Sequence, residues 1–333
     1  MEKPADLGPS RPMARRRPAQ VHGLLIVDKP SGCTSHDVVD RVRRIMGERR
    51  VGHSGTLDPD ATGVLVCGIG EATRLLRFLD MVQRDGRPTT SKTYRGSVVL
   101  GTETDSLDAS GSVTAVHDMS DLVARLTVES AQEVVDRHFK GEISQVPPMV
   151  SAIRVDGQRL HELARQGVEV ERQARQVTIH DIDVVAVEDG VIDLEVTCSS
   201  GTFIRTLAAD LGTVLGGGAH LRNLRRTAVG PFTVDEAVSL DLLESLDVEA
   251  ARRHLLPVVD CVRGLSVHRA TADLQARVSV GSVLPESTFE GPPPWAVVSE
   301  NADEVLAIYE PFSNERVGPN MARPVVVLAA PGH

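Results

Sequence analysis

One aspartate in this sequence stands where a carboxylate could be held in place for chemistry. Asp58 lies within residues 51–64, VGHSGTLDPDATGV, a segment that we call the Asp58 loop. Its three glycines let the backbone approach a ligand closely, and the proline after Asp58 restricts the conformation of the aspartate. A carboxylate restrained in this way can serve as a nucleophile. An ordinary glycine- and proline-rich turn is the alternative interpretation.

Apolar segments on either side of the Asp58 loop predict the elements that hold it. Residues 23–28 and 64–67 are short apolar runs typical of buried strands. Between them, Thr34 begins a capping-box pattern, and apolar residues at helical spacing predict a helix that Gly47 ends. We therefore expect the Asp58 loop at the edge of a sheet, open to a ligand on one side.

The remaining periodicity indicates the fold class. Helices are expected at 71–80, at 203–215 and within 234–260, and strands at 92–100, 176–186 and 191–198. Hairpins join the strands as often as helices do, which favours an α+β domain with a largely antiparallel central sheet flanked by helices. From about residue 265, short β-branched runs, the first at 277–283, predict a small β-rich domain.

Three parts of the chain follow from these patterns. Residues 1–20 are rich in proline and arginine and are expected to form a disordered basic arm. Residues 21–264 are expected to form the main α+β domain, and residues 265–333 the small β-rich domain. The chain has no apolar run long enough to span a membrane and no secretory signal, so a cytoplasmic location is expected.

Charge and cysteine content restrict the possible partners and cofactors. The net charge is −10, which by itself argues against nucleic acid, but basic clusters occur at 41–50 and 222–226 and could form an RNA-binding face. The four cysteines lie far apart, with no CxxC pattern and no clustering with histidine. This spacing predicts reduced thiols and argues against a metal site.

Five motifs in order resemble the TruB family of tRNA pseudouridine synthases. They are the segments 23–31, 52–63, 92–95, 145–157, and 201–206 together with 216–226. The resemblance covers residues 21 to about 232 and implies the pseudouridine synthase fold; the resemblance of residues 265–333 to the family's PUA-like domain is weaker. It also implies isomerisation of the T-loop uridine at tRNA position 55 to pseudouridine, with base flipping and without cofactor or metal.

The resemblance assigns catalytic roles to three residues. Asp58 aligns with the essential aspartate, which acts as a nucleophile at C1′ or at C6 of the base, or helps to form a glycal intermediate; the sequence does not choose among these routes. Arg205 aligns with the arginine that pairs with this aspartate. Tyr94 aligns with the tyrosine that stacks on the flipped uracil and could act as a general acid or base. Asp60, the neighbouring carboxylate, receives no role.

Six further residues are candidates for RNA binding. His53 aligns with a histidine that fills the space left by the flipped nucleotide, and Lys29 either contacts RNA or supports the loop. Phe203 stands where many relatives have tyrosine, which removes a hydroxyl, and a hydroxyl-dependent role there is in doubt. Arg154 and His161 also depart from the usual family residues. The complete RNA-binding set is His53, Lys29, Phe203, Leu224, Arg49 and Arg222.

Other functions remain as alternatives. One is a guide-RNA-dependent pseudouridine synthase that works in a ribonucleoprotein, and another is a non-catalytic RNA-binding or RNA-folding module. A glycosidase-like hydrolase that uses Asp58 and Asp60 is a more distant alternative. For the standalone synthase we expect a monomer that acts on the T-arm loop of tRNA, with no obligate protein partner and no membrane attachment.

Overall fold

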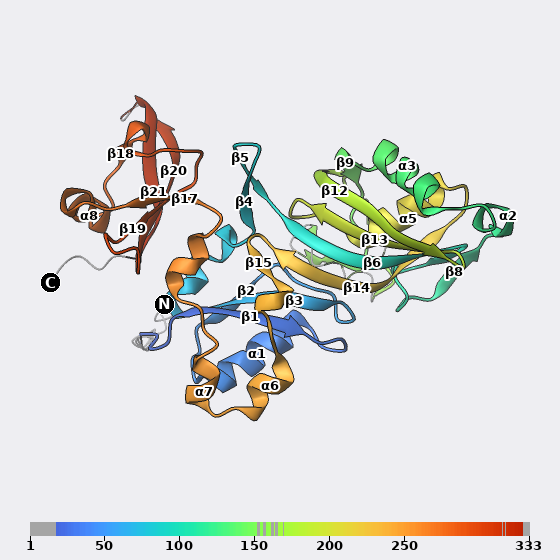
Figure 1. The fold of residues 1–333 in the computed structure, drawn as a ribbon, viewed down its shortest axis with the longest axis horizontal. Coiled ribbons are helices and arrows are strands. Elements are labelled where there is room, and N and C mark those ends of the chain that lie inside the picture. The colour runs from blue at the N-terminus through green and yellow to red at the C-terminus, as the bar shows by residue number, and fades with distance from the viewer. Residues whose placement is uncertain are drawn as a thin grey trace, which may run out of the picture.

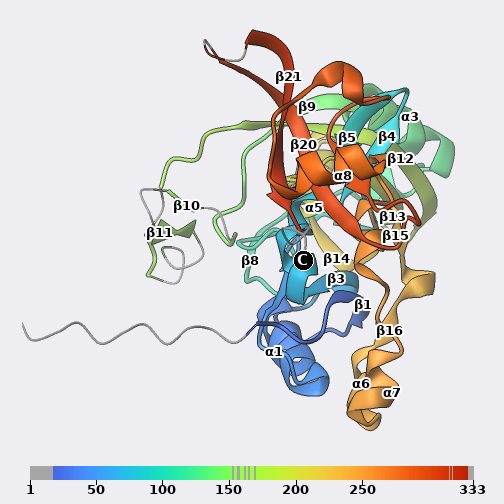
Figure 2. The same ribbon diagram turned by 90° about the vertical axis from the view of Figure 1, so that its left-hand side faces the viewer.

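The computed structural model describes residues 18–328 except 152–153, 156–157, 161–162, 164–165, 169, 315 and 317. Nearly all of the predicted basic arm lies outside the described residues, as do His161 and the side chain of Arg154. Figures 1 and 2 show two sheets, a large one that carries most of the helices and a smaller one formed by the C-terminal part of the chain.

A ten-stranded sheet is the framework of the larger part. Its strands follow the order β16-β1-β3-β14-β6-β13-β12-β9, with β15 paired to β14 and β2 paired to β3. Only the β1–β16 and β14–β3 pairs are parallel, so the prediction of a largely antiparallel sheet is confirmed. The strands are β1 (Gly23–Lys29), β2 (Val51–Ser54), β3 (Thr62–Ile69), β6 (Lys92–Leu100), β9 (Gly141–Gln145), β12 (Arg175–Glu188), β13 (Val191–Cys198), β14 (Ala219–Val229), β15 (Phe232–Thr233) and β16 (Val238–Ser239).

Helices cover this sheet in two groups. Helix α1 begins at Thr34, whose side chain forms the predicted capping box with Asp37, and ends at Gly47 in the left-handed conformation. It packs with α6 and α7 against the β1–β3 side, whereas α3 and α5 cover the β6–β12 side. The helices are α1 (Ser35–Met46), α2 (Ser120–Val123), α3 (Val128–His138), α5 (Ile204–Val214), α6 (Leu240–Ser245) and α7 (Val248–Arg252).

Short two-stranded hairpins project from the large sheet. The pairs are β4 (Met81–Arg84) with β5 (Arg87–Thr90), β7 (Thr102–Thr104) with β8 (Val113–Val116), and β10 (Arg154–Val155) with β11 (Gln158–Arg159). The first hairpin rises between the two sheets in Figure 1.

The α-helix expected at 71–80 is not formed. Two 3₁₀ helices, η1 (Gly70–Arg74) and η2 (Leu76–Phe78), occupy the segment. Ala72, Leu75 and Phe78 recur every third residue and all three are buried. Three residues per turn bring such positions to one side, so the tighter helix buries them better than an α-helix would.

The C-terminal part forms a separate five-stranded sheet in the order β17-β19-β20-β21-β18. The strand expected at 277–283 is wrong, because helix α8 (Ala272–Ser279) starts at the Thr271 cap and inserts Val278 into the core while Val280 is exposed. The strands are β17 (Ser266–Arg269), β18 (Leu284–Pro285), β19 (Trp295–Val298), β20 (Val305–Asn314) and β21 (Gly318–Val327), and 3₁₀ helices are η3 (Val234–Glu236), η4 (Val258–Val262) and η5 (Glu286–Thr288).

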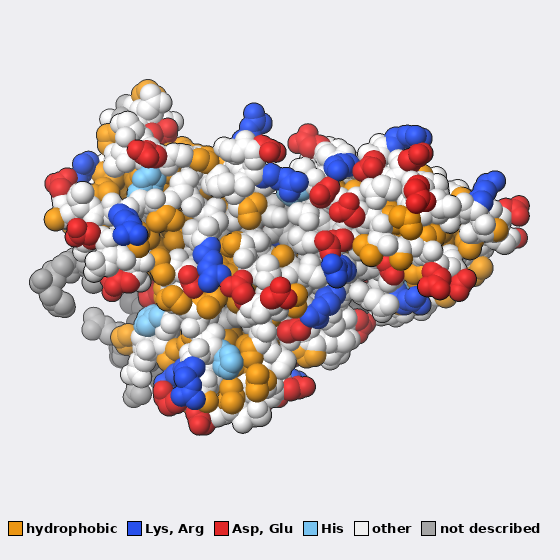
Figure 3. Space-filling view, viewed as in Figure 1, with side chains coloured by type: hydrophobic (Ala, Val, Ile, Leu, Met, Phe, Trp, Pro, Cys, Tyr) orange, Lys and Arg blue, Asp and Glu red, His pale blue; other side chains and the backbone are white. Residues whose placement is uncertain are grey.

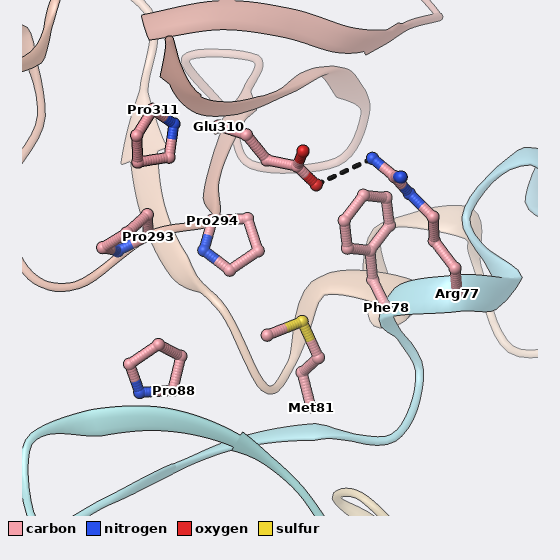
Figure 4. Close-up of a pocket in the computed structure, with 8 residues that line it drawn as sticks. All are labelled: Arg77, Phe78, Met81, Pro88, Pro293, Pro294, Glu310 and Pro311. Carbon is pink, nitrogen blue, oxygen red and sulfur yellow. Dashed lines mark hydrogen bonds and ion pairs between the residues drawn. The ribbon is translucent and has the colours of Figure 1, made fainter. Parts of the chain in front are cut away.

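The two sheets share one hydrophobic core. Leu24 and Val66 of the large sheet belong to the same buried cluster as Val298 and Ile308 of the small one. Beside this cluster an open cavity of about 490 Å³ lies between the two parts, and an Arg77–Glu310 ion pair of 2.7 Å crosses it (Figure 4). In the part of the chain that the structure describes, no helix is long and apolar enough to cross a membrane.

Candidate active site

The middle of the Asp58 loop, residues 55–61, connects β2 to β3 and is held by helix α1. Ser35, at the start of α1, accepts a 2.9 Å hydrogen bond from the Leu57 amide and donates one of 3.2 Å to the Leu57 carbonyl. Gly63 takes φ +101° where β3 pairs with β14, and a methyl group there would lie 2.1 Å from the carbonyl oxygen of Arg226. Only glycine allows this approach, so the backbone around Asp58 is fixed on both sides.

Lys29 lies beneath the Asp58 loop rather than on the surface. It is fully buried, and its ammonium donates hydrogen bonds of 2.9, 2.9 and 2.7 Å to the carbonyls of Pro30, Pro59 and Ala61. Burial lowers the pKa of Lys29. Because all three donors bind the backbone, the geometry favours the supporting role for Lys29 over the contact with RNA.

We expect Lys29→Met to lower the free energy of unfolding by about 2–4 kcal/mol, because several buried carbonyl oxygens lose their donor. Urea denaturation followed by circular dichroism measures the change. Lys140→Met is the control: Lys140 is exposed and pairs with Asp181, so its loss is expected to cost less than about 1 kcal/mol. Equal effects of the two substitutions would contradict the supporting role.

Arg205 holds the Asp58 carboxylate with two contacts. Its Nε lies 3.0 Å from Oδ2 of Asp58, and its Nη2 lies 3.1 Å from Oδ1. The guanidinium also donates to the carbonyls of Ser106 (3.0 Å) and Val150 (2.8 Å), and only 5% of its side chain is exposed. A planar fork that is buried and fixed by two backbone carbonyls orients the carboxylate far better than a mobile surface arginine would.

Asp108 is a member of the site that the sequence reasoning missed. Its Oδ2 lies 3.5 Å from Nη1 of Arg205, so this arginine lies between two carboxylates. Oδ1 of Asp108 accepts hydrogen bonds from Ser106 Oγ and from the amide and hydroxyl of Ser110. The signal was the run DSLDASG, in which serines two residues before and after the aspartate favour a turn that its side chain organises.

The surroundings of Asp58 shift its ionisation. Burial raises the pKa of the Asp58 carboxyl, and the Arg205 guanidinium opposes that shift. The side chain of Asp58 is 41% exposed, and it lines two adjoining cavities. The carboxylate is thus partly withdrawn from water, and Arg205 favours its charged form.

Two adjoining cavities open at Asp58. The smaller one, about 130 Å³, includes Tyr94, Phe203 and Leu224 in its lining, and the larger one, about 410 Å³, includes Arg222. Asp58, Arg205 and Leu224 line both cavities. The smaller space is bounded by an aromatic ring, a leucine and an ion pair, as a planar polar ring would require.

Tyr94 and Leu224 reach the smaller cavity from neighbouring strands. Tyr94 lies on β6 and is 9% exposed; burial raises the pKa of its hydroxyl, which remains protonated at neutral pH. On β14 the pairing slips between Arg222 and Arg225, with Asn223 at φ +56°. This bulge turns Leu224 toward the cavity.

The basic cluster expected at 222–226 does not form one surface. Arg222 is exposed and Arg225 makes a two-pronged ion pair with Asp28, at 3.0 and 2.8 Å. Arg226 is fully buried and donates to the carbonyls of Val64 (2.7 Å) and Gly55 (3.0 Å). Arg226 therefore supports the Asp58 loop from below.

The site residues predicted from the sequence separate into two groups. Asp58, Tyr94, Arg205, Phe203 and Leu224 meet at the smaller cavity, and Arg222 lies at the larger one.

His53 and Arg49 line neither of these cavities. His53 lies on β2, half-buried, and burial lowers its pKa, so its imidazole is neutral at pH 7. Arg49 is exposed just before β2. Within the described ranges, no group of three or more histidine, cysteine, aspartate or glutamate side chains is arranged to hold a metal ion.

Two family models match this chain. The family model described as TruB family pseudouridylate synthase (N terminal domain) matches residues 43–204, and the model described as tRNA pseudouridylate synthase B C-terminal domain matches residues 205–263. The second match ends just before β17. We propose that the main domain ends at residue 264 and that the small β-rich domain begins at residue 265.

Named relatives match over most of the chain. The tRNA pseudouridine synthase B of Thermobifida fusca is 45% identical over 92% of this chain and 98% of its own, and that of Syntrophotalea carbinolica is 46% identical over 73% and 75%. Among solved structures, a Cbf5-Nop10-Gar1 complex contains a chain that is 25% identical, with a TM-score of 0.66 over 93% of this chain and 85% of that one.

Proposed function

Because the chain belongs to the TruB family of pseudouridylate synthases, we propose that it converts a uridine of tRNA to pseudouridine, and that this uridine lies in the T-loop, at position 55. One observation carries the proposal at this site: a carboxylate fixed by a buried guanidinium opens into a cavity beside an aromatic ring. Nucleic-acid binding alone does not require a carboxylate that is fixed in this way and faces a polyanion.

The reaction breaks the bond between C1′ and N1, turns the uracil and forms a bond between C1′ and C5. The proton on C5 is lost and N1 gains one, so no redox partner is needed. Asp58 supplies the nucleophilic carboxylate, at C1′ or at C6, or assists a glycal route. Arg205 keeps this carboxylate charged and aimed into the cavity.

The remaining lining residues hold the flipped base. The Tyr94 ring stacks on the uracil, while Leu224 and Phe203 supply apolar contact. The Tyr94 hydroxyl is protonated at neutral pH, so it acts as a hydrogen-bonding group or proton donor rather than as a phenolate.

Contacts with the rest of the T-arm are assigned to His53, Arg49 and Arg222. The two arginines are exposed and bind phosphates, and the neutral imidazole of His53 fills the place of the flipped nucleotide. On the face in Figure 3, basic and acidic side chains are intermixed. We assign the activity to a monomer without protein partners, acting in the cytoplasm.

The test is incubation of the purified chain with an unmodified tRNA transcript, without cofactor or guide RNA, followed by site-resolved pseudouridine mapping. We expect pseudouridine at the T-loop uridine alone. Tight tRNA binding without product would favour a guide-dependent synthase or a binding module instead. The 45% identity with Thermobifida fusca tRNA pseudouridine synthase B, over 92% of this chain, supports the standalone enzyme.

A further inference from the structure

A buried charged network lies beneath the Asp58 loop. The Lys92 ammonium donates a 2.6 Å hydrogen bond to Ser200 Oγ and lies 3.1 Å from Oδ2 of Asp80. Ser200 Oγ donates a short hydrogen bond to the same carboxylate oxygen. The side chains of Lys92 and Asp80 are each only 11% exposed. Burying such a pair adds little net stability over apolar residues of similar size, so a role in fixing geometry explains it better.

The network joins the three segments that carry the catalytic side chains. Lys92 begins β6, two residues before Tyr94. Ser200 lies five residues before Arg205, in the turn that leads into α5. On its remaining side Lys92 faces the Asp58 loop, where a methyl group at Gly55 would lie 3.0 Å from Nζ. The ammonium thus belongs to β6, bonds to the turn before α5 and fills the space beside Gly55 of the loop.

Further contacts tie the same elements together. The Ser200 amide donates a 2.8 Å hydrogen bond to Thr90 Oγ1, and the Asp80 carbonyl accepts one of 2.7 Å from the Ser91 amide. Asp80 and Ser200 therefore fasten the chain on both sides of the hairpin that precedes Lys92.

The network is not a second nucleophilic site. A serine–lysine nucleophile requires the serine to give its proton to the lysine. Here the Ser200 hydroxyl accepts a hydrogen bond from Lys92 and donates its proton to Asp80. The contacts hold three segments together and leave no reactive hydroxyl.

We propose that Lys92 is a positioning residue for the reaction. Held by Asp80 and Ser200, it fixes the Asp58 loop, strand β6 and the start of α5 relative to one another, and through them the three side chains at the smaller cavity. The inference rests on the proposed function, because pseudouridine formation is its readout.

The test compares Lys92→Met with Ser200→Ala, which removes only one contact of the ammonium. In single-turnover assays on tRNA we expect the rate of Lys92→Met to be about 30- to 100-fold below wild type, since a displacement of about 1 Å costs up to about 100-fold. For Ser200→Ala we expect a rate about 3- to 10-fold below wild type. tRNA affinity should stay within about threefold. In Lys92→Met the acid limb of the pH–rate profile should move to higher pH, because a displaced Arg205 stabilises the charged Asp58 less well.

Tyr309→Phe is the matched control for lost stability. It removes a 2.9 Å hydrogen bond to the Ser282 carbonyl in the C-terminal sheet, far along the chain from the network, and should leave the rate and the pH profile unchanged.

Two results would overturn the positioning role. One is a wild-type rate in both network variants. The other is an unshifted acid limb in Lys92→Met together with a rate loss no greater than that of Tyr309→Phe. If Lys92→Met does not fold, Ser200→Ala decides, and a wild-type rate in that variant counts against the role. An inactive wild-type protein would instead count against the proposed function itself, because the network variants are read against it.

Discussion

Asp58→Asn is expected to abolish pseudouridine formation, with a loss of at least about 10⁴-fold in the single-turnover rate, because an amide cannot act as the nucleophile. Asparagine keeps the size of the side chain, so the loop and the ion-pair partner stay in place. Removing a negative charge from a site that faces RNA should leave tRNA affinity equal or slightly tighter. Pseudouridine mapping and filter binding on the same tRNA transcript measure the two effects.

Asp60→Asn is the matched control, since it makes the same change on the same loop two residues later. Asp60 is exposed and does not pair with Arg205, so we expect its rate to fall by less than about tenfold. Product formation by Asp58→Asn at the wild-type rate would remove Asp58 from the mechanism. A greater loss of rate in Asp60→Asn than in Asp58→Asn would mean that Asp60, rather than Asp58, is the catalytic carboxylate.

Arg205→Lys is expected to lower the rate by about 10²–10³-fold, although the positive charge is kept. A lysine cannot contact both oxygens of Asp58 and also bind the carbonyls of Ser106 and Val150. The Asp58 carboxyl then loses part of the interaction that opposes its raised pKa.

The sign of the pH effect follows from this pairing. The nucleophile must be ionised, so activity is lost as the pH falls through the pKa of Asp58, which burial has already raised. In Arg205→Lys this pKa rises further, and the acid limb of the pH–rate profile should move to higher pH. An unchanged acid limb together with a normal rate would contradict the role of Arg205.

Arg225→Lys provides the control for the arginine chemistry itself. Arg225 also holds an aspartate with two contacts, but its partner is Asp28, outside both cavities at Asp58. We expect this variant to keep the rate within about threefold and the acid limb in place. A similar loss in both variants would mean that a disturbed fold, rather than the lost pairing, explains the result.

Local patterns predicted the parts of the fold that local forces decide. The Thr34 cap, the strands around the Asp58 loop and the antiparallel hairpins follow from spacing and turn residues within a few positions. The prediction of an α-helix at 71–80 was wrong because the apolar residues of this segment fit both helical periods, and their packing in the cluster between the two sheets is not visible in the local sequence. The prediction of a strand at 277–283 was wrong because the helix that starts at the Thr271 cap extends into this segment despite its β-branched residues.

The candidate site was predictable where a motif carries it and unpredictable where the contacts are distant in sequence. Asp58, Tyr94 and Arg205 were expected from the resemblance, and the structure brings them to one cavity. Nothing local distinguishes Arg226, which is buried, from Arg222, which is exposed, because the bulge in β14 decides which side chain points inward. Asp108 depends on a contact with Arg205 almost a hundred residues later.

The apolar cluster shared by the two sheets bears on whether the C-terminal sheet can fold independently. Val298 and Ile308 pack with Leu24 and Val66 in one apolar cluster. The C-terminal sheet is therefore not an independent domain that a gene fusion could replace without loss of packing. Cutting the chain at 264 would expose an apolar surface on both halves and favour aggregation. Both faces of the small sheet are therefore committed: Val297 and Tyr309 pack in a cluster with Val278 of α8, whereas Val298 and Ile308 pack against strands more than two hundred residues earlier.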